Sequence, residues 1–231
     1  VANTIVQNTS GPKEANDFWS RAELNLLMAL IHYVVNLRDA NGNLLPIEQR
    51  GLGDVYRMIA TESIEEINHR LAALPPEHPA KYPHGLFLKA KENLWGNIVI
   101  GLGNRLAVFQ SRLVDKITRN HDVDLLLPGK RPCVYFVIIS AQDSAYRFLS
   151  SLFFSLALPQ LSNFARLQCA GGRLPVLTNF CLDEYCNIGY LDGVADSLNS
   201  IRGFNMSAQI VVQSLSQWQE KYPGKEWENQ L

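Results

Sequence analysis

Residues 174–189 read LPVLTNFCLDEYCNIG, a stretch in which an apolar run ends at two adjacent carboxylates, Asp183 and Glu184. A short apolar run of this kind is typical of a strand buried in a parallel sheet, and we predict such a strand within residues 171–182. In open α/β sheets, ligands bind beyond the carboxyl ends of the strands. Asp183 and Glu184 are therefore predicted to lie at the edge of a sheet where a ligand binds.

The sequence on both sides of this stretch continues an alternation of strand and helix. Strands are predicted at 133–140 (CVYFVIIS) and 207–214 (SAQIVVQS), and helices at 141–161 and 191–202. The first of these helices is predicted to begin near Asp143 or Ser144, and the strand at 133–140 to be buried on both faces. Strand, helix, strand, helix, strand at short spacing is the pattern of an α/β domain.

The N-terminal half has the periodicity of helices instead. Helices are predicted at 15–37, capped by Asn16 or Asp17, around 52–60, at 63–74, where Ser63 and Glu66 have capping-box spacing, and along 86–119. Glycines inside the last helix are expected to bend it or to let another helix approach closely: Gly96, Gly101 and Gly103. Four prolines in residues 75–83 predict that 75–85 has no regular structure.

These patterns divide the chain into a connecting segment at 1–13, an all-α domain at 14–122 and an α/β domain at 123–231. The fold class is α/β with an all-α domain, in which a helical bundle precedes a partial parallel sheet. The length of 231 residues allows this core without disulfides, and the four cysteines are interpreted as reduced thiols.

The composition excludes some classes of function. A net charge of −1 argues against binding to nucleic acid or membrane mainly through overall charge. No stretch reaches the roughly 20 apolar residues needed to span a bilayer. The chain begins at Val1 without an initiator methionine, so we interpret it as an excised fragment.

An acidic pair at the end of a strand is used in nucleotide hydrolysis. The first carboxylate holds Mg²⁺, usually through water, and the second orients the attacking water or takes its proton. Arg202 at the end of the following helix and Gln213 at the end of the next strand are predicted to share this edge of the sheet. The alternatives are structural: acids that cap the turn, an arginine that complements a helix C-terminus, and a solvated glutamine at a strand end.

Residues 174–218 resemble the Walker B region of the type IV secretion coupling proteins, the TraG-type conjugation ATPases, which are similar to the FtsK and HerA motors. The family pattern is an apolar strand, LDE, an aromatic residue, Asn-Ile-Gly, an arginine at a helix end, and a strand finishing in Gln-Ser. This chain matches it with Asp183, Glu184, Tyr185, Asn187, Ile188, Gly189, Arg202, Gln213 and Ser214. The stretches 130–158 and 15–34 are also similar to the family, so the resemblance covers nearly the whole chain.

The resemblance implies a partial RecA-like nucleotide-binding domain and a role for each matched residue. Asp183 is implied as the partner of Mg²⁺, through water, and Glu184 as the catalytic base. Arg202 is implied as an arginine finger that acts in a neighbouring subunit, and Gln213 as a phosphate sensor. ATP and Mg²⁺ are the implied cofactors of the parent protein.

One feature of the family is missing. No G-x-x-x-x-G-K-[ST] phosphate loop occurs in the chain, and the Gly129-Lys130 pair is followed by Arg131. In the family that loop lies before the all-α domain, as do the membrane-spanning helices. We therefore expect this soluble fragment to hold half of an active site and to bind no ATP tightly.

The resemblance further implies an ATP-driven parent at the cytoplasmic face of the bacterial inner membrane. It would deliver DNA or protein substrates to a type IV secretion channel as a homo-oligomer, expected to be a hexamer. Its implied partners are a relaxase or other secreted protein, single-stranded DNA and other channel proteins. The alternative is a non-catalytic docking module. A third interpretation, a hydrolase that pairs Asp183 or Glu184 with a histidine, lacks a histidine near the strand ends.

Overall fold

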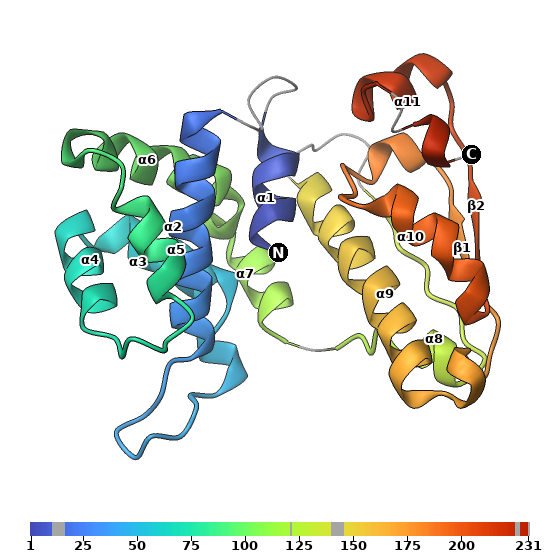
Figure 1. Ribbon diagram of the computed structural model, residues 1–231, viewed down its shortest axis with the longest axis horizontal. Coiled ribbons are helices and arrows are strands. Elements are labelled where there is room, and N and C mark those ends of the chain that lie inside the picture. Colours follow the sequence, from blue (N-terminus) through green and yellow to red (C-terminus); the bar gives the residue numbers. More distant parts are fainter. Residues whose placement is uncertain (11–16, 121, 140–145, 225–226, 231) are drawn as a thin grey trace. The chain divides into compact units, whose positions relative to one another are not determined.

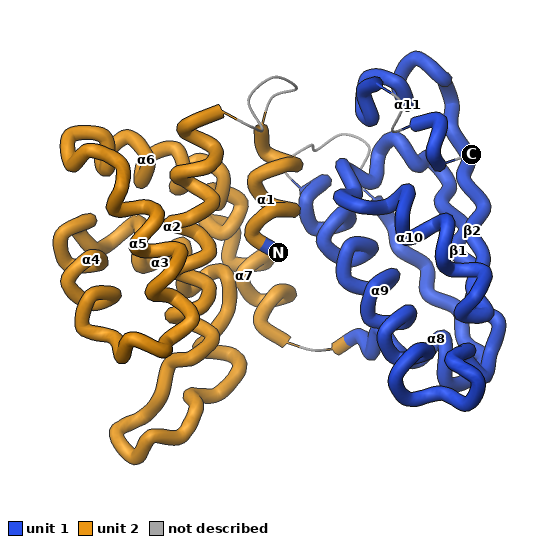
Figure 2. The backbone as a smooth tube through the Cα atoms, viewed as in Figure 1, with its two compact units in different colours: residues 1, 123–231 blue, residues 2–122 orange. Residues whose placement is uncertain are grey.

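A computed structural model describes residues 1–10, 17–120, 122–139, 146–224 and 227–230 (Figure 1). The chain divides into two compact units, which are coloured separately in Figure 2. We name Ala2–Asp122 the helical unit and Val123–Leu231 the α/β unit. Each unit is described by itself.

The helical unit consists of helices and short 3₁₀ turns. Its elements are α1 (Ala2–Thr9), α2 (Phe18–Val35), η1 (Ile47–Gln49), α3 (Leu52–Thr61), α4 (Ile64–Ala72), α5 (Lys81–Phe87), α6 (Glu92–Arg105), η2 (Ala107–Gln110) and α7 (Arg112–Arg119). Helix α2 is central, because it contacts α1, α3, α5 and α6. Leu26, Leu27 and Leu30 of α2 are fully buried, so this helix supplies much of the core of the unit.

Local capping signals are confirmed in this unit. The Asp17 carboxylate accepts a hydrogen bond from the Ser20 main-chain N–H at 2.7 Å, so Asp17 caps α2 as predicted. Asn16, the other candidate, lies outside the described residues. Ser63 and Glu66 form the predicted capping box of α4. These caps depend on residues three positions apart and could be read from the sequence alone.

Three predictions for the helical unit are wrong. The segment 75–85 is partly helical, because Pro83 lies in the first turn of α5, where a missing N–H costs no intrahelical bond. The helix predicted along 86–119 is interrupted: its first two residues end α5, and residues 88–91 are not helical. The rest divides into α6, η2 and α7 at Leu106 and Ser111 rather than bending at a glycine. Residues 2–9, which we read as part of a connecting segment, form helix α1.

Gly101 lets helix α6 approach α2 closely, as expected. A Cβ at this position would lie 1.9 Å from Oε1 of Glu23 on α2. That carboxylate forms a buried ion pair with Arg105, with 2.5 Å between Oε2 and Nε. Arg105 also donates to the hydroxyls of Thr9 and Ser10, so the pair links α6 to α1 and α2.

The α/β unit contains a parallel two-stranded sheet within its described residues. Its elements are α8 (Leu127–Lys130), α9 (Arg147–Gln168), η4 (Ala170–Gly172), β1 (Thr178–Leu182), η5 (Tyr185–Asn187), α10 (Val194–Ile201), η6 (Arg202–Phe204), β2 (Met206–Ile210), α11 (Leu215–Lys221) and η7 (Glu228–Gln230). The register pairs Thr178 with Met206 and Leu182 with Ile210. The parallel sheet and the surrounding helices confirm the predicted fold class.

One face of the sheet is packed and the other is open. Leu182 and Met206 are buried in a cluster with Phe154, Leu158 and Leu161 of α9. The opposite face carries exposed side chains from alternate positions of the two strands: Asn179, Cys181, Ser207 and Gln209. Strand β1 is therefore buried on one face only.

The strand predicted at 133–140 is not present in its described part, residues 133–139. Phe136 is 87% exposed and Ile138 is 95% exposed, so the apolar run is not buried. A cavity of about 910 Å³ lies between this segment and β1, and Phe153 and Phe154 of α9 line it as well. A strand forms only with a neighbour at hydrogen-bonding distance, about 4.8 Å, and the cavity separates the two segments here.

Helix α9 ends at Gln168 rather than near 161, where the predicted helix ended. The start predicted at Asp143 or Ser144 lies outside the described residues. By length and composition, α9 is the one described helix apolar enough to cross a membrane, although its sequence seemed too short to do so. Ser151, Ala157 and Leu161 are buried, as in the core helix of a globular domain.

Candidate functional site

The carboxyl ends of β1 and β2 bring the acidic pair and Gln213 together. Asp183 and Glu184 follow β1 directly, and Gln213 comes three residues after β2. Two main-chain bonds extend the pairing beyond the strands, from Val211 N–H to the Leu182 carbonyl at 3.1 Å and from Tyr185 N–H to the Val211 carbonyl at 3.0 Å. The ends of the two strands are thus held side by side, as the sequence predicted for these residues.

Two side-chain amides contact the Glu184 carboxylate. Asn187 Nδ2 donates to Oε2 at 3.0 Å, and Gln213 Nε2 lies 3.4 Å from Oε1, which is long for a hydrogen bond. Both carboxylate oxygens therefore face neutral donors rather than a cation. These two contacts orient the carboxylate while leaving it open to solvent, because Glu184 is exposed.

The main chain of Glu184 adopts the left-handed conformation, with φ 52° and ψ 42°. This conformation costs about 1 kcal/mol or more for a residue with a Cβ atom. The turn is kept closed by a 2.7 Å bond from the Asn187 N–H to the Glu184 carbonyl. Strained main-chain conformations cluster at functional sites, so this geometry adds weight to Glu184 as a site residue.

Asp183 lies at the same edge with its carboxylate exposed. Its Oδ1 accepts from the Glu184 main-chain N–H at 3.1 Å, which orients the side chain. No cluster of three or more His, Cys, Asp or Glu side chains occurs among the described residues. One carboxylate is what Mg²⁺ needs from a protein when phosphate oxygens and water supply its other ligands, so the donor set fits that ion.

The Arg202 guanidinium is at the other end of the sheet, and our prediction that it shares an edge with the acidic pair is wrong. Arg202 begins η6, which precedes β2. Main-chain bonds from Leu174 to Phe204 at 3.0 Å and from Thr178 to Asn205 at 3.2 Å place this segment beside the start of β1. Five-residue strands span about 13 Å, so Arg202 is remote from Glu184 in the same chain.

The physical reason is the connection between parallel strands. The chain leaves β1 at its carboxyl end and must return to the amino end before β2 begins. Helix α10 makes this return, so Arg202, which directly follows α10, belongs to the amino-terminal edge. Arg202 is exposed there.

Behind the acidic turn lies a buried aromatic cluster that the sequence reading missed. The hydroxyl oxygens of Tyr185 and Tyr222 lie 3.0 Å apart, and that of Tyr185 lies 2.8 Å from Oε1 of Gln230. Trp218 Nε1 donates to the same Oε1 at 3.0 Å. Burial raises the pKa of both tyrosines, so the hydroxyls stay protonated, Tyr185 donates to Gln230, and Tyr222 donates to Tyr185. Tyr185, which directly follows the Leu-Asp-Glu motif, was the feature of the sequence that could have indicated this cluster.

The Gly129-Lys130 pair does not form a phosphate loop. Lys130 ends the four-residue helix α8, and its Nζ forms an ion pair with Asp124 at 3.3 Å. A Cβ at Gly129 would lie 2.8 Å from Cδ2 of Leu174, so this glycine serves close packing.

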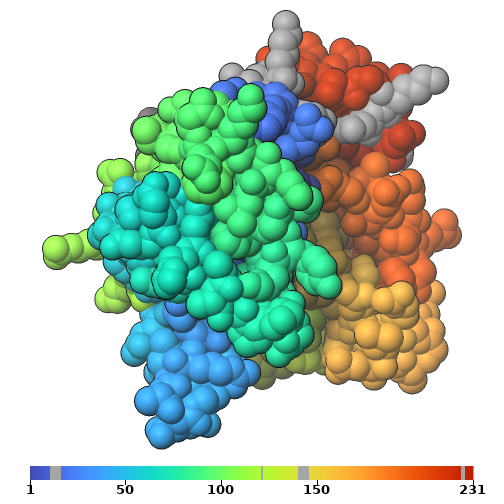
Figure 3. Space-filling view, turned by 60° about the vertical axis from the view of Figure 1, so that its left-hand side comes forward, coloured from blue at the N-terminus to red at the C-terminus, as the bar shows by residue number. Residues whose placement is uncertain are grey.

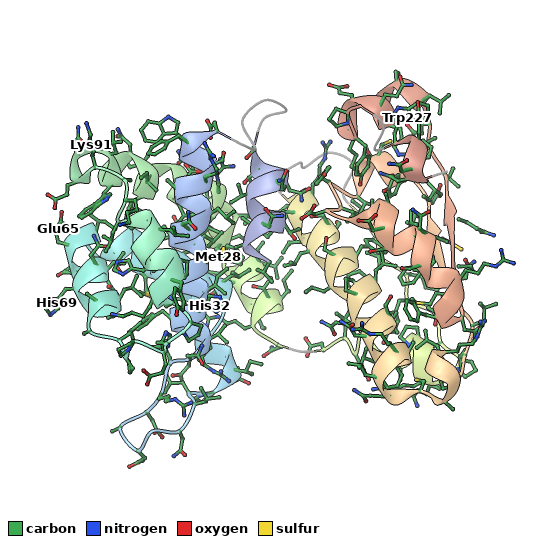
Figure 4. All side chains as sticks on the ribbon, in the orientation of Figure 1. Met28, His32, Glu65, His69, Lys91 and Trp227 are labelled. Carbon is green, nitrogen blue, oxygen red and sulfur yellow. The ribbon has the colours of Figure 1, made fainter. Side chains whose placement is uncertain are left out.

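Histidine catalysis at the strand ends has no support among the described residues. His32, His69, His78 and His84 all belong to the helical unit, and Figure 4 labels the first two on α2 and α4. His84 Nε2 lies 2.9 Å from Oδ1 of Asn68, and burial lowers its pKa, as for a core histidine. His121 lies outside the described residues.

Comparison with known proteins gave one family. A family model described as type IV secretory system conjugative DNA transfer matches residues 1–231. Comparison with curated proteins and with solved structures gave no match. The family match covers both units, and the resemblance of residues 174–218 to the coupling proteins agrees with it.

Proposed function

Because the chain belongs to the type IV secretory system conjugative DNA transfer family, we propose that its α/β unit supplies half of an ATP-hydrolysing site that drives this transfer. The observation that carries the proposal is the meeting of Glu184 and Gln213 at the carboxyl ends of β1 and β2. A carboxylate beside a neutral amide at this edge is suited to holding a water molecule against a terminal phosphate.

The chain's own residues divide the work. Glu184 orients the attacking water and accepts its proton, and Gln213 donates to the water or to the phosphate. Asp183, oriented by the Glu184 N–H, is the residue that would hold Mg²⁺ through water. When bound, the ion would neutralise phosphate charge.

Arg202 is proposed to act in a neighbouring subunit. Its place at the amino-terminal edge of the sheet removes it from the Glu184 of its own chain, and its side chain is exposed. An arginine that reaches a neighbour's site stabilises the charge of the transition state and is worth about 10³ to 10⁵ in rate. This role requires a homo-oligomer, and we propose a hexameric ring.

ATP binding requires a phosphate loop, so the 231-residue chain alone is expected neither to bind ATP tightly nor to hydrolyse it. In a protein that joins this chain to such a loop, hydrolysis would move single-stranded DNA with a bound relaxase, or another secreted protein, into the channel. The proposed location is the cytoplasmic face of the bacterial inner membrane, beside other channel proteins.

A docking role without catalysis is the second candidate. Tyr82 and Leu86 lie one turn apart on α5 and are 80% and 59% exposed. Figure 3 shows this part of the helical unit, around residues 80–90, at the surface. Exposed apolar side chains on one helix face fit contact with a protein partner. In this alternative the α/β unit only supports the helices.

Hydrolysis measurements separate the two candidates. In a protein that joins this chain to a phosphate loop, Glu184→Gln is expected to retain Mg²⁺-ATP binding and to lower the hydrolysis rate by about 10² or more. Glu220→Gln, at an exposed position of α11, is the matched control and should leave the rate unchanged. DNA transfer that continues at the wild-type level with Glu184→Gln would reject the motor and favour the docking module.

A further inference from the structure

Lys221 is a partly buried lysine that the proposed reaction does not use. It is the last residue of α11, and its Nζ donates to the main-chain carbonyls of Tyr185 and Cys186 at 3.0 and 3.1 Å. Both carbonyls belong to η5, the turn that directly follows Glu184. Nζ also lies 5.2 Å from the ring centroid of Tyr185 and 5.7 Å from that of Tyr222, within the range of cation–π attraction.

Burying the ammonium group of a lysine at this place costs free energy, so the presence of Lys221 needs a physical explanation. Burial lowers the pKa of Lys221 to about 7, because the charged ammonium loses water. The Cys186 thiol from η5 and the Arg147 guanidinium from α9 also face it. Among the described residues, Lys221 forms no salt bridge with a carboxylate. An apolar side chain of similar length would pack here without this cost.

The hydrogen bonds that Lys221 donates to the turn η5 offset the cost of desolvating its ammonium group. The Tyr185 carbonyl also accepts from the Ile188 main-chain N–H at 3.3 Å, which closes η5, and the Tyr185 and Cys186 carbonyls converge on one ammonium group. Hydrogen bonds from a charged donor are roughly twice as strong as those between neutral groups. The ammonium therefore fixes the main chain immediately after the strained Glu184.

The same helix also fixes the other half of the site. Helix α11 begins at Leu215, two residues after Gln213. The chain from Gln213 through α11 to Lys221 returns to the turn, and the Gln213 amide faces Glu184 at 3.4 Å. The two polar groups of the site are thus joined through one short helix.

We infer that Lys221 is a positioning residue, which sets the distance between the Glu184 carboxylate and the Gln213 amide through the Tyr185 and Cys186 carbonyls. The meaning of that distance for catalysis rests on the proposed function. The distance itself is a property of the chain, and it can be tested without ATP or hydrolysis.

The test uses NMR of the 231-residue chain below pH 7, where Lys221 is charged. The readouts are the side-chain carboxyl ¹³C signal of Glu184 and the side-chain amide signals of Asn187 and Gln213. Lys221→Met is expected to shift all three, while the main-chain amide signals of β1 and β2 stay in place. Lys221→Arg, which keeps two donors, should restore most of the wild-type positions, and Gln219→Met, an exposed position of α11, should change none.

Two results would overturn the inference. The first is a Lys221→Met chain whose Glu184, Asn187 and Gln213 signals remain at their wild-type positions. The second is a Lys221→Met chain in which the main-chain amide signals of β1 and β2 shift as much as the Glu184, Asn187 and Gln213 signals, and in which Lys221→Arg does not restore the wild-type positions. Lys221 would then only stabilise the fold.

If Lys221→Met does not fold, a pH titration of the wild-type chain followed by NMR tests the same inference. The Asn187 and Gln213 amide signals should move with the midpoint of the Lys221 Cε signal, and no movement there rejects the inference. Failure of this test leaves the proposed hydrolysis standing, whereas absence of hydrolysis in the longer protein leaves the positioning role of Lys221 standing.

Discussion

Nε2 of Gln213 and Oε1 of Glu184 lie 3.4 Å apart, although 29 residues separate them in the chain. The parallel pairing of β1 with β2 creates this contact, because it places both carboxyl ends at one edge. The contact is weak as a hydrogen bond, so it fixes the two groups less firmly than the main chain beneath them does.

The left-handed conformation of Glu184 makes a stability prediction. At an ordinary position alanine is more stable than glycine, but here Glu184→Gly is expected to exceed Glu184→Ala in free energy of unfolding by about 1 kcal/mol. Urea denaturation of the two variants measures the difference. Ser200, in the last turn of α10, is the comparison site and should show the opposite order. An alanine variant at 184 that equals or exceeds the glycine variant would argue against the left-handed turn.

The lowered pKa of Lys221 predicts that the free energy of unfolding depends on pH. Its pKa is about 7 in the folded chain and 10.5 in an unfolded one, so the unfolded chain binds the extra proton between these values. The free energy of unfolding of the α/β unit should therefore rise with pH above 7, by at most about 1.4 kcal/mol per pH unit. Burial raises the pKa of Cys186, Tyr185 and Tyr222, so in the folded chain these groups lose their protons at higher pH than usual.

Denaturation measured from pH 7 to about 9 checks this slope. Lys221→Met should reduce it, because a methionine has no proton to lose, and the Val1 amino group, whose pKa burial lowers, accounts for the remaining slope. A wild-type curve that is flat or falls over this range would show that the ammonium is not desolvated as the structure indicates.

The buried ion pair between Glu23 and Arg105 in the helical unit predicts that removing one partner costs more stability than removing both. The side chains of Glu23 and Arg105 are only 7% and 11% exposed. Arg105→Ala leaves a buried carboxylate without its partner and is expected to cost about 3 to 5 kcal/mol of stability. The double variant Glu23→Leu with Arg105→Met should be close to wild type, because both charges are then removed. Thermal unfolding compares them, and equal losses in both variants would contradict this account.

The exposed run at 133–139 gives a direct check on the lost strand. Ile138→Lys is expected to change stability by less than about 0.5 kcal/mol, because the side chain is in solvent. Leu161→Ala, at a buried position of α9, should cost about 2 to 5 kcal/mol in the same assay. A loss from Ile138→Lys as large as that from Leu161→Ala would restore the buried strand that the sequence predicted.

The role of Arg202 in a neighbouring subunit can be tested by mixing subunits. In a protein that joins this chain to a phosphate loop, Arg202→Ala and Glu184→Gln should each be inactive alone. Random mixing of equal amounts should restore activity at about a quarter of the sites, where an intact Glu184 meets an intact Arg202 of the neighbour. Mixed rings without activity would assign Arg202 to another role.

Some of this structure could be predicted from local sequence. The Asp17 cap and the Ser63–Glu66 capping box depend on contacts three residues apart, and a strand before Asp183 follows from an apolar run. The position of Gln213 also followed, because two parallel strands place their ends together.

The errors come from contacts that a local pattern does not contain. Residues 133–139 have strand composition, but a strand also needs a neighbouring main chain, and a cavity lies where it would be. A proline breaks a helix only when it lies beyond the first turn, and Pro83 lies in the first turn of α5. Arg202 was misplaced although the return of α10 between parallel strands was available as an argument from topology.

The carboxamide oxygen of Gln230 accepts hydrogen bonds from both Tyr185 and Trp218 and is enclosed by aromatic rings. Hydrolysis of a carboxamide needs water, and this side chain is only 7% exposed, so it is sheltered from deamidation during storage. Aged preparations of this chain should therefore keep the same buried support beneath the acidic turn as fresh ones.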